Sequence, residues 1–198
     1  MINDSYTRGF GLLEVFLTKL RANKANSFIS KEHKRGRVLD IGCGSRPYFL
    51  SKSTFKEKYG IDPSVNVDKV NDRDINLLKM DVGNGKLPFK DNFFDVVTML
   101  AVFEHIDNDK LNGVLKEIER VLKKDGLFII TTPAPWADKL LHFMARLFLI
   151  SAEEVHEHKH NHQKTRIEDL INQAGFKKNK IKSGFFEFYM NMWFIGVK

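Results

Sequence analysis

The sequence has 198 residues, of which 42% are hydrophobic and 12% aromatic. This length and apolar content suit a globular protein with a sizeable core, and they exclude a disordered or low-complexity chain. Lys and Arg number 32 against 25 Asp and Glu, a formal charge of +7, which raises the question of a nucleic-acid partner. Because the basic residues are scattered over several segments, a solvated surface explains this charge better.

The sequence also lacks a disulfide framework and a recognisable targeting segment. Its single cysteine, Cys43, excludes an internal disulfide and a multi-cysteine zinc site. Residues 1–4 lack the basic and apolar blocks of a signal peptide, and no apolar run reaches the roughly 18 residues that cross a bilayer. We therefore expect a cytoplasmic protein without a transmembrane segment.

Residues 6–30 have the pattern of an amphipathic helix, and a basic linker follows it. Apolar side chains recur there at intervals of three and four positions, at Phe10, Leu13, Phe16, Leu17 and Leu20. This spacing places them on one helical face. The pattern allows two interpretations, a helix that packs on the edge of a sheet or one that covers a bound ligand.

Residues 37–44, RVLDIGCG, combine a β-branched and aliphatic run with two glycines. The run suits a buried parallel strand, and Gly42 and Gly44 let the backbone turn sharply and approach a ligand closely. Pro47 suits the first turn of a following helix. It also occupies the third glycine position of the dinucleotide fingerprint, and no P-loop string occurs. The segment predicts a strand, a ligand-binding loop and a helix.

Three later strand-like stretches also end at polar residues. Asp62 closes residues 59–62, twenty positions after Gly42, as a ribose-binding acid does. Asp81 lies in the next stretch, residues 77–82, and residues 94–99 lead into Glu104 and His105. Because the carboxyl ends of parallel strands meet at one edge of a sheet, these residues predict a nucleoside site there.

Residues 38–133 resemble the class I S-adenosylmethionine-dependent methyltransferases, in a type 11-like subgroup. VLDIGCG is similar to motif I of that family, YGIDPS to its motif II acid and KMDV to its adenine-binding acid. LPFKDNFFDVV resembles its "LPF.D.SFDVV" segment, and residues 104–105 and 117–126 resemble its "EH" loop and "E..RVLKPGG" junction. Arg46 and Pro47 stand where many members have a further glycine, so we expect different contacts to the methionine end.

The resemblance implies an α/β fold, a Rossmann-like three-layer sandwich. Its sheet has seven mostly parallel strands in the order 3-2-1-4-5-7-6, with an N-terminal helix and a helical insertion after the fifth strand. We expect a single domain over 1–198, divided into helix and linker (1–36), cofactor-binding core (37–133), insertion (134–164) and C-terminal helix and hairpin (165–198). The residue pattern predicts a helix over 107–123, a fifth strand over 127–132, a helix over 166–174, and final strands over 176–188 and 192–197. Thr165 and Glu168 have the spacing of a capping box for the helix over 166–174.

The resemblance also implies S-adenosyl-L-methionine as cofactor. Asp62 would bind the ribose, Asp81 and Val82 the adenine, and the backbone of residues 42–44 the methionine moiety. Asp40 braces the loop. The full expected set is Asp40, Gly42, Cys43, Gly44, Asp62, Pro63, Asp81, Val82 and Leu100. Cys43 is expected to fill space rather than act as a nucleophile.

Two histidines are candidate bases for an acceptor that must lose a proton. His105 follows the fourth strand, and His158 is the second candidate, because histidine is the side chain most often used as a general base. In related sequences a histidine-bearing run like that from residue 157 borders the acceptor pocket. A histidine that only orders its loop is an equal interpretation of His105, and Glu104 is expected to be structural.

Residues 136–150 form an apolar, helix-patterned insertion that is too short to span a bilayer. It can pack on the domain, cover a bulky acceptor, or make a membrane-surface or dimer contact. The next stretch, residues 156–160, matches the H-E-x-x-H zinc motif. Its polar flanks and Gln163, which stands where the longer motif needs glycine, argue against a zinc hydrolase, and we expect no metal.

The sequence thus predicts a methyltransferase that acts on a small-molecule or glycan-type (saccharide) acceptor. The loop over 101–105 lacks the N-P-P-Y string of base-amine methyltransferases, so nucleic acid is disfavoured. A catalytically silent module that binds S-adenosylmethionine and an RNA methyltransferase are the alternatives.

Overall fold

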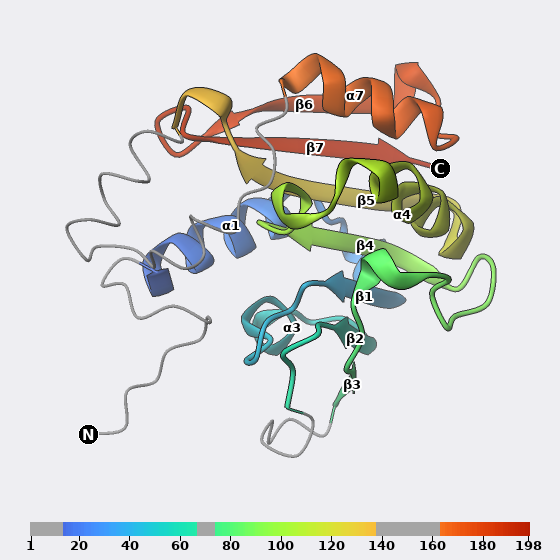
Figure 1. Cartoon of the computed structure of the whole chain (residues 1–198). Helices are drawn as coiled ribbons and strands as arrows, with labels where there is room; N and C mark the ends of the chain where they lie inside the picture. The colour runs from blue at the N-terminus through green and yellow to red at the C-terminus, as the bar shows by residue number, and fades with distance from the viewer. Residues whose placement is uncertain (1–13, 67–73, 138–162) are drawn as a thin grey trace.

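The computed structural model describes residues 14–66, 74–137 and 163–198. These residues form a seven-stranded sheet in the order β3-β2-β1-β4-β5-β7-β6 (Figure 1). Strand β7 runs antiparallel to both of its neighbours, and the other pairs are parallel. The predicted fold class and strand order are confirmed.

The described chain begins with two helices and ends with two strands, and strands and helices follow one another between them. The strands are β1 (Arg37–Ile41), β2 (Glu57–Ile61), β3 (Ile75–Leu78), β4 (Phe94–Leu100), β5 (Leu122–Pro133), β6 (Ile181–Phe186) and β7 (Asn191–Val197). The α-helices are α1 (Glu14–Phe28), α2 (Lys31–Lys34), α3 (Tyr48–Lys52), α4 (Asn108–Val121) and α7 (Lys164–Gln173). Short 3-10 turns are η2 (Val82–Asn84), η3 (Phe103–His105), η4 (Pro135–Ala137) and η5 (Lys178–Lys180).

Two hydrophobic clusters, one on each face of the sheet, hold the layers together. Helices α1 and α3 cover one face, and α4 and α7 cover the other (Figure 1). Along β5 the side chains alternate between the faces: Ile129 belongs to the α1 cluster, whereas Phe128 and Ile130 belong to the α4 cluster. This alternation is the period of two that a strand imposes. Because both faces are covered, the central strands β1 and β4 are mostly apolar, with Asp40 and Thr98 as buried polar exceptions.

Arg120, near the end of α4, ties that helix to the loop before β4. Its guanidinium donates both Nε and Nη2 to the Glu117 carboxylate, at 2.9 and 2.7 Å, and Nη1 to Asp91 at 2.7 Å. It also donates to the backbone carbonyls of Phe89 and Leu87. The hydrogen bonds to Glu117 are the largest cause that raises the pKa of Arg120, so this cation keeps its charge. The LPF segment and the "E..R" helix are therefore one structural unit.

Some local predictions were wrong. Strand β3 ends at Leu78, so Asp81 begins a 3-10 turn instead of closing a strand. Helix α7 is capped by Gln163 rather than Thr165, and no side-chain hydrogen bond caps it. The Glu168 carboxylate instead accepts hydrogen bonds from Lys164 Nζ, in the first turn of the same helix, and from the Ser183 hydroxyl on β6.

Three other boundaries also differ from the sequence prediction. Helix α4 gives way to β5 at Leu122, and β6 begins only at Ile181.

In α1 the buried face carries Ala22 and Ala25, whereas Phe16 is 56% exposed. These small residues let α1 lie close to the sheet. The apolar pattern in the sequence had placed the buried face on the larger residues, among them Phe16, and so did not predict this close packing.

Within residues 14–66, 74–137 and 163–198, no helix has both the length and the apolar character needed to cross a bilayer. The apolar insertion from residue 138 onward and the histidine motif at residues 156–160 lie outside the described residues.

Candidate cofactor site

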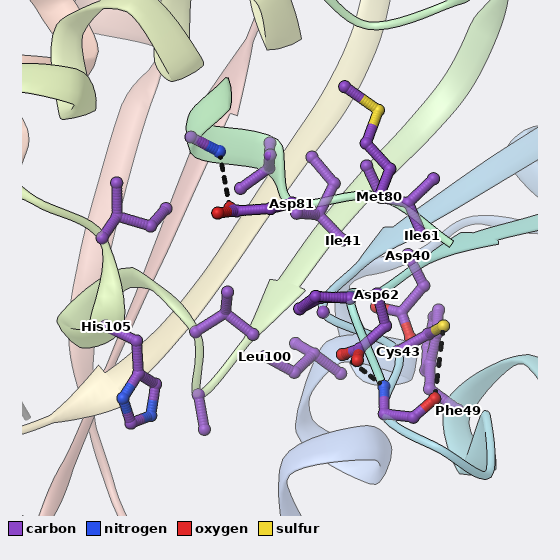
Figure 2. Close-up of a pocket in the computed structure, with 18 of the residues that line it drawn as sticks. Asp40, Ile41, Cys43, Phe49, Ile61, Asp62, Met80, Asp81, Leu100 and His105 are labelled. Atoms are coloured by element: carbon purple, nitrogen blue, oxygen red, sulfur yellow. Dashed lines mark hydrogen bonds between the residues drawn. The ribbon is translucent and has the colours of Figure 1, made fainter. Parts of the chain in front are cut away.

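A cavity of about 650 Å³ opens at the carboxyl edge of the sheet (Figure 2). The loops after β1, β2, β3 and β4 line it, and helix α1 contributes Thr18, Arg21 and Ala22. Its volume lies within the range of about 300–1,000 Å³ that is usual for small-molecule sites. It also lies where ligands bind in open parallel sheets, beside the point at which the strand order reverses.

The glycine-rich loop after β1 forms the floor of this cavity. Gly42 and Gly44 have φ values of +72° and +74°, in the left-handed region that side chains disfavour. A Cβ added at Gly42 would lie 2.1 Å from Val102 Cγ2, whereas at Gly44 nothing lies within 4 Å. Gly42 is therefore required by packing, and Gly44 leaves open space on the cavity side.

Asp62, directly after β2, fastens the glycine-rich loop to the second strand. Its side chain is buried, and Oδ2 accepts a 3.0 Å hydrogen bond from the Gly44 amide (Figure 2). Oδ1 accepts a 2.7 Å bond from the Ser64 amide. The Ser64 hydroxyl also donates to Oδ1, so both lone pairs of that oxygen are used and a ligand hydroxyl would bind at Oδ2.

Asp81 lies at the start of η2, on the far side of the cavity from the Gly44 loop. Its Oδ1 accepts from the Gly83 amide at 2.9 Å, and Oδ2 accepts from Asn84 Nδ2 at 2.9 Å. The residue is exposed, and its neighbours Met80 and Val82 also line the cavity. Two carboxylates, one directly after β2 and one at the turn that follows β3, therefore flank the same space (Figure 2).

Asp40, in β1, and Cys43, in the glycine-rich loop, are both buried. Thr98 Oγ1 donates a 2.6 Å hydrogen bond to Asp40 Oδ1. Burial raises the pKa of Asp40 to about 7, the Thr98 bond lowers it, and the Asp62 charge adds to the rise. Burial is also the largest cause that raises the pKa of the Cys43 thiol, and the charges of Asp40 and Asp62 raise it further. The thiol thus stays protonated, which agrees with a packing role.

The β4 side of the cavity carries a strained residue and a histidine. Ala101 has φ +57°, and its amide donates to Thr131 O at 2.9 Å. His105 lies on η3, on the opposite side of the cavity from Cys43 (Figure 2). Glu104 is buried, and its Oε2 accepts a 3.1 Å hydrogen bond from Thr132 Oγ1. This contact agrees with the structural role expected for Glu104.

All nine predicted cofactor-binding residues line this one cavity, as does His105, whereas His158 lies outside the described residues. Their contacts with a ligand stay a prediction. Sequence reasoning missed Arg21 and Lys110, which also line the cavity. Arg21 belongs to a helix whose apolar spacing was its only signal. In the part of the chain that the structure describes, no three His, Cys, Asp or Glu residues gather as a metal site would require.

These residues fit S-adenosylmethionine. The open space beside Gly44, the buried carboxylate of Asp62 and the exposed one of Asp81 supply a close backbone approach and acceptors for hydroxyl and amino groups. A cavity of about 650 Å³ is also large enough for a nucleoside with an amino-acid tail.

Comparison with known proteins agrees with this geometry. A family described as a methyltransferase domain matches residues 39–130. The demethylmenaquinone methyltransferase of Staphylococcus saprophyticus is 31% identical over 173 residues, which cover 74% of this chain and 72% of that protein. An uncharacterized protein of Methanocaldococcus jannaschii is 35% identical over 104 residues, or 52% of this chain; the match spans only 39% of that relative's length.

A solved structure also shares the fold. The SAM-dependent methyltransferase of Archaeoglobus fulgidus has a TM-score of 0.69 at 18% identity, over 92% of this chain and 94% of that one. The identity and coverage of the staphylococcal relative, together with the matched domain, show the family. The chain belongs to the class I, type 11-like methyltransferases, whose cofactor is S-adenosylmethionine.

Proposed function

We propose that the protein transfers a methyl group from S-adenosylmethionine to a small-molecule or saccharide-type acceptor. The observation that carries this proposal is the cavity in which Gly44, Asp62 and Asp81 converge from three loops. The relatives include enzymes named for demethylmenaquinone and for a sterol, which are small acceptors. The loop after β4 also lacks the string typical of enzymes that methylate base amines.

Each side chain takes a role that suits its position. Asp62 binds the ribose hydroxyls, and Asp81 with the Val82 amide binds the adenine edge. The amides of residues 42–44 hold the methionine end. Bound S-adenosylmethionine supplies a methyl group that is already activated by its sulfonium, so the protein mainly aligns the acceptor and excludes water.

His105 is the proposed base when the acceptor atom is a hydroxyl oxygen. It lines the cavity from η3, the turn that follows β4. A ring nitrogen of His105 would take the hydroxyl proton as that oxygen accepts the methyl group that S-adenosylmethionine would supply. General base catalysis typically contributes about 10²–10⁴-fold. His105→Gln should therefore lower kcat by a factor in that range with an unchanged Kd for S-adenosylmethionine.

Calorimetry on the wild type, Asp62→Asn and Asp109→Asn tests the cofactor site. Asp109 is an exposed acid in the first turn of α4 and does not line the cavity, so it is the matched control. Because hydrogen bonds to a charged group contribute about 1.5–3 kcal/mol, Asp62→Asn should weaken binding about tenfold or more. The control variant should bind like the wild type.

Transfer of a labelled methyl group from the cofactor to a small-molecule extract of the source cells then tests the activity. A labelled small-molecule product supports the proposal. Binding without transfer indicates a catalytically silent module, label found only in RNA indicates the nucleic-acid alternative, and a wild type that binds no S-adenosylmethionine contradicts the site itself.

A further inference from the structure

The edge of the sheet opposite the cofactor cavity is built from segments that lie far apart in the sequence. Because only β7 runs antiparallel, this edge holds the amino ends of the other six strands and the carboxyl end of β7. In Figure 1 the C label at the end of β7 marks this edge, and the arrowheads of β4 and β5 mark the opposite one. We call it the amino edge, and its segments are residues 31–37, 56–58, 74–75, 90–95, 122–125, 177–182 and 198.

The amino edge carries the positive charge of the protein. Its segments hold 14 of the 32 Lys and Arg residues but only 6 of the 25 Asp and Glu residues. The rest of the chain is close to neutral, because its 18 basic residues are matched by 19 acidic ones. The basic residues that are scattered along the sequence are therefore gathered by the fold.

Hydrogen bonds and one ion pair join these segments into a continuous surface. The Lys56 amide donates to the Lys34 carbonyl at 3.1 Å, which links the start of β2 to α2. His33 Nε2 lies 3.5 Å from the Asp125 carbonyl oxygen, at the start of β5. Lys180 Nζ donates to Asp125 Oδ1 at 3.2 Å, which brings the segment before β6 to the same place. The surface thus runs from β2 to β6.

The acidic side chains at this edge are largely occupied, whereas many of the cations are not. Four ion pairs join Glu57 to Arg37, Asp95 to Lys123, Asp125 to Lys180 and Asp91 to Arg120. Within the described parts of the chain, five exposed cations of the amino edge make no ion pair within 4 Å, namely Arg35, Lys56, Lys124, Lys177 and Lys178. Like charges that are gathered in this way attract a polyanion.

The amino edge lacks the side chains with which proteins bind single-stranded bases or enter lipid. Among the described residues, the exposed large hydrophobic side chains all lie elsewhere, at Val15, Phe16, Leu78, Trp136, Phe185, Phe188 and Tyr189. Single-stranded nucleic acids are bound by aromatic stacking, and membrane surfaces by buried apolar area. A surface of cations alone therefore favours a partner whose bases are already stacked and whose outside is phosphate.

The dimensions of the surface also suit a duplex. Six neighbouring strands from β2 to β6, spaced by about 4.8 Å, make a stripe about 24 Å long. A DNA duplex presents one negative charge for about every 1.7 Å of its axis, so such a stripe faces a dense row of phosphates. This charge density exceeds that of a single strand, and the release of its counterions drives binding.

We propose that the amino edge binds a nucleic-acid duplex through its phosphates. Strand β4 has seven residues, so roughly 20 Å separates this edge from the cofactor cavity. The duplex is therefore a docking partner and not the methyl acceptor, and the inference is independent of the proposed methyl transfer. Because phosphate contacts carry no base information, binding has no sequence preference.

Fluorescence anisotropy with a labelled DNA duplex of about 20 base pairs, between 50 and 200 mM salt, tests this surface. One triple variant changes the amino edge, with Lys56→Gln, Lys124→Gln and Lys178→Gln. The matched control changes three exposed cations elsewhere, with Lys19→Gln, Lys116→Gln and Arg166→Gln, and has the same net charge. The edge variant should weaken binding about tenfold or more, and its slope of log K against log salt should be smaller by about 2–3. The control should bind within about twofold of the wild type with an unchanged slope.

The single variants and the fold of each protein are checked in the same way. Lys56→Gln and Lys178→Gln should each lower the slope by about 0.9, as expected for one lost phosphate contact. Urea midpoints equal to that of the wild type show that the variants are folded, since these cations make no ion pair. Equal weakening by the edge variant and the control would mean that binding follows net charge alone, and would overturn the surface.

Two competitors identify the class of partner. Single-stranded DNA of the same length, and vesicles of phosphatidylcholine with phosphatidylserine, are each added at a concentration of negative charge equal to that of the duplex. Neither should displace more than half of the labelled duplex. Displacement by the single strand or by the vesicles beyond that point would overturn the duplex assignment, and a wild type that binds no duplex at 50 mM salt would overturn the proposal as a whole.

Discussion

At the scale of single residues, the two glycines of the loop after β1 share a left-handed backbone but have different surroundings. A Cβ at Gly42 would collide with Val102, whereas a Cβ at Gly44 would meet only open space on the cavity side. Both changes strain the backbone by about 1–2 kcal/mol. Only Gly42→Ala adds a collision, whereas Gly44→Ala leaves packing intact and fills space in which we propose that the cofactor binds.

Gly42→Ala should therefore destabilise the protein by about 3 kcal/mol or more. Gly44→Ala should cost only about 1–2 kcal/mol but weaken S-adenosylmethionine binding about tenfold or more. Urea unfolding and calorimetry on both variants check this. Unaltered cofactor affinity in Gly44→Ala would contradict the placement of the ligand beside this glycine.

Asp40 gives the protein a pH-dependent stability. Its pKa is about 7 in the folded protein against 3.8 in the reference state, mainly because of burial. The folded state therefore binds more protons than the unfolded chain between these values, so stability falls as the pH rises from about 4 to about 7. Asp40→Asn stays neutral and can still accept from Thr98.

This variant should remove a decline on the order of 1–3 kcal/mol in the unfolding free energy between pH 5 and pH 8. Urea unfolding of the wild type and the variant at both pH values measures the difference. An equal pH dependence in the two proteins would show that Asp40 ionises as easily in the folded state as in the unfolded chain.

At the scale of elements, Arg120 determines how α4 meets the loop before β4. It makes five hydrogen bonds to Glu117, Asp91, Leu87 and Phe89. Lys has no planar fork and cannot reproduce this geometry. Arg120→Lys should therefore lower the unfolding free energy by about 2 kcal/mol. Lys116→Ala, at an exposed position of the same helix, should change it by less than about 0.5 kcal/mol. Urea unfolding compares the two, and equal effects would contradict the role given to Arg120.

Elements with local signals were predicted well, and elements that depend on distant neighbours were not. Strand β1 and its loop are marked by a β-branched run that ends at Gly42 and Gly44. The start of α7 was misplaced because Glu168 bonds across to Ser183 on β6, so the capping pattern at Thr165 is not used. Propensity yields here to tertiary contacts.

The sequence predicted those residues of the candidate site that lie in a short local string, and it missed those that do not. Asp62 and Asp81 were found because each follows a strand within a short, recognisable string. Arg21 and Lys110 have no such string, since each reaches the cavity from a helix and not from a strand end. Such a convergence depends on the fold and leaves no mark in the local sequence.

At the scale of the whole molecule, the carboxyl edge of the sheet gathers the proposed contacts into one cavity. The loops after β1, β2 and β3 carry the proposed nucleoside contacts, and the loop after β4 carries His105, the proposed base. Helix α1 contributes Thr18, Arg21 and Ala22 to the same cavity.

A crystal structure of the protein with S-adenosylmethionine at saturating concentration tests the central claim most directly. The account predicts ribose hydroxyls within hydrogen-bond distance of the Asp62 carboxylate, the adenine beside Asp81 and the methionine end over Gly44. A nucleoside bound elsewhere, or a cavity without cofactor under those conditions, would contradict it.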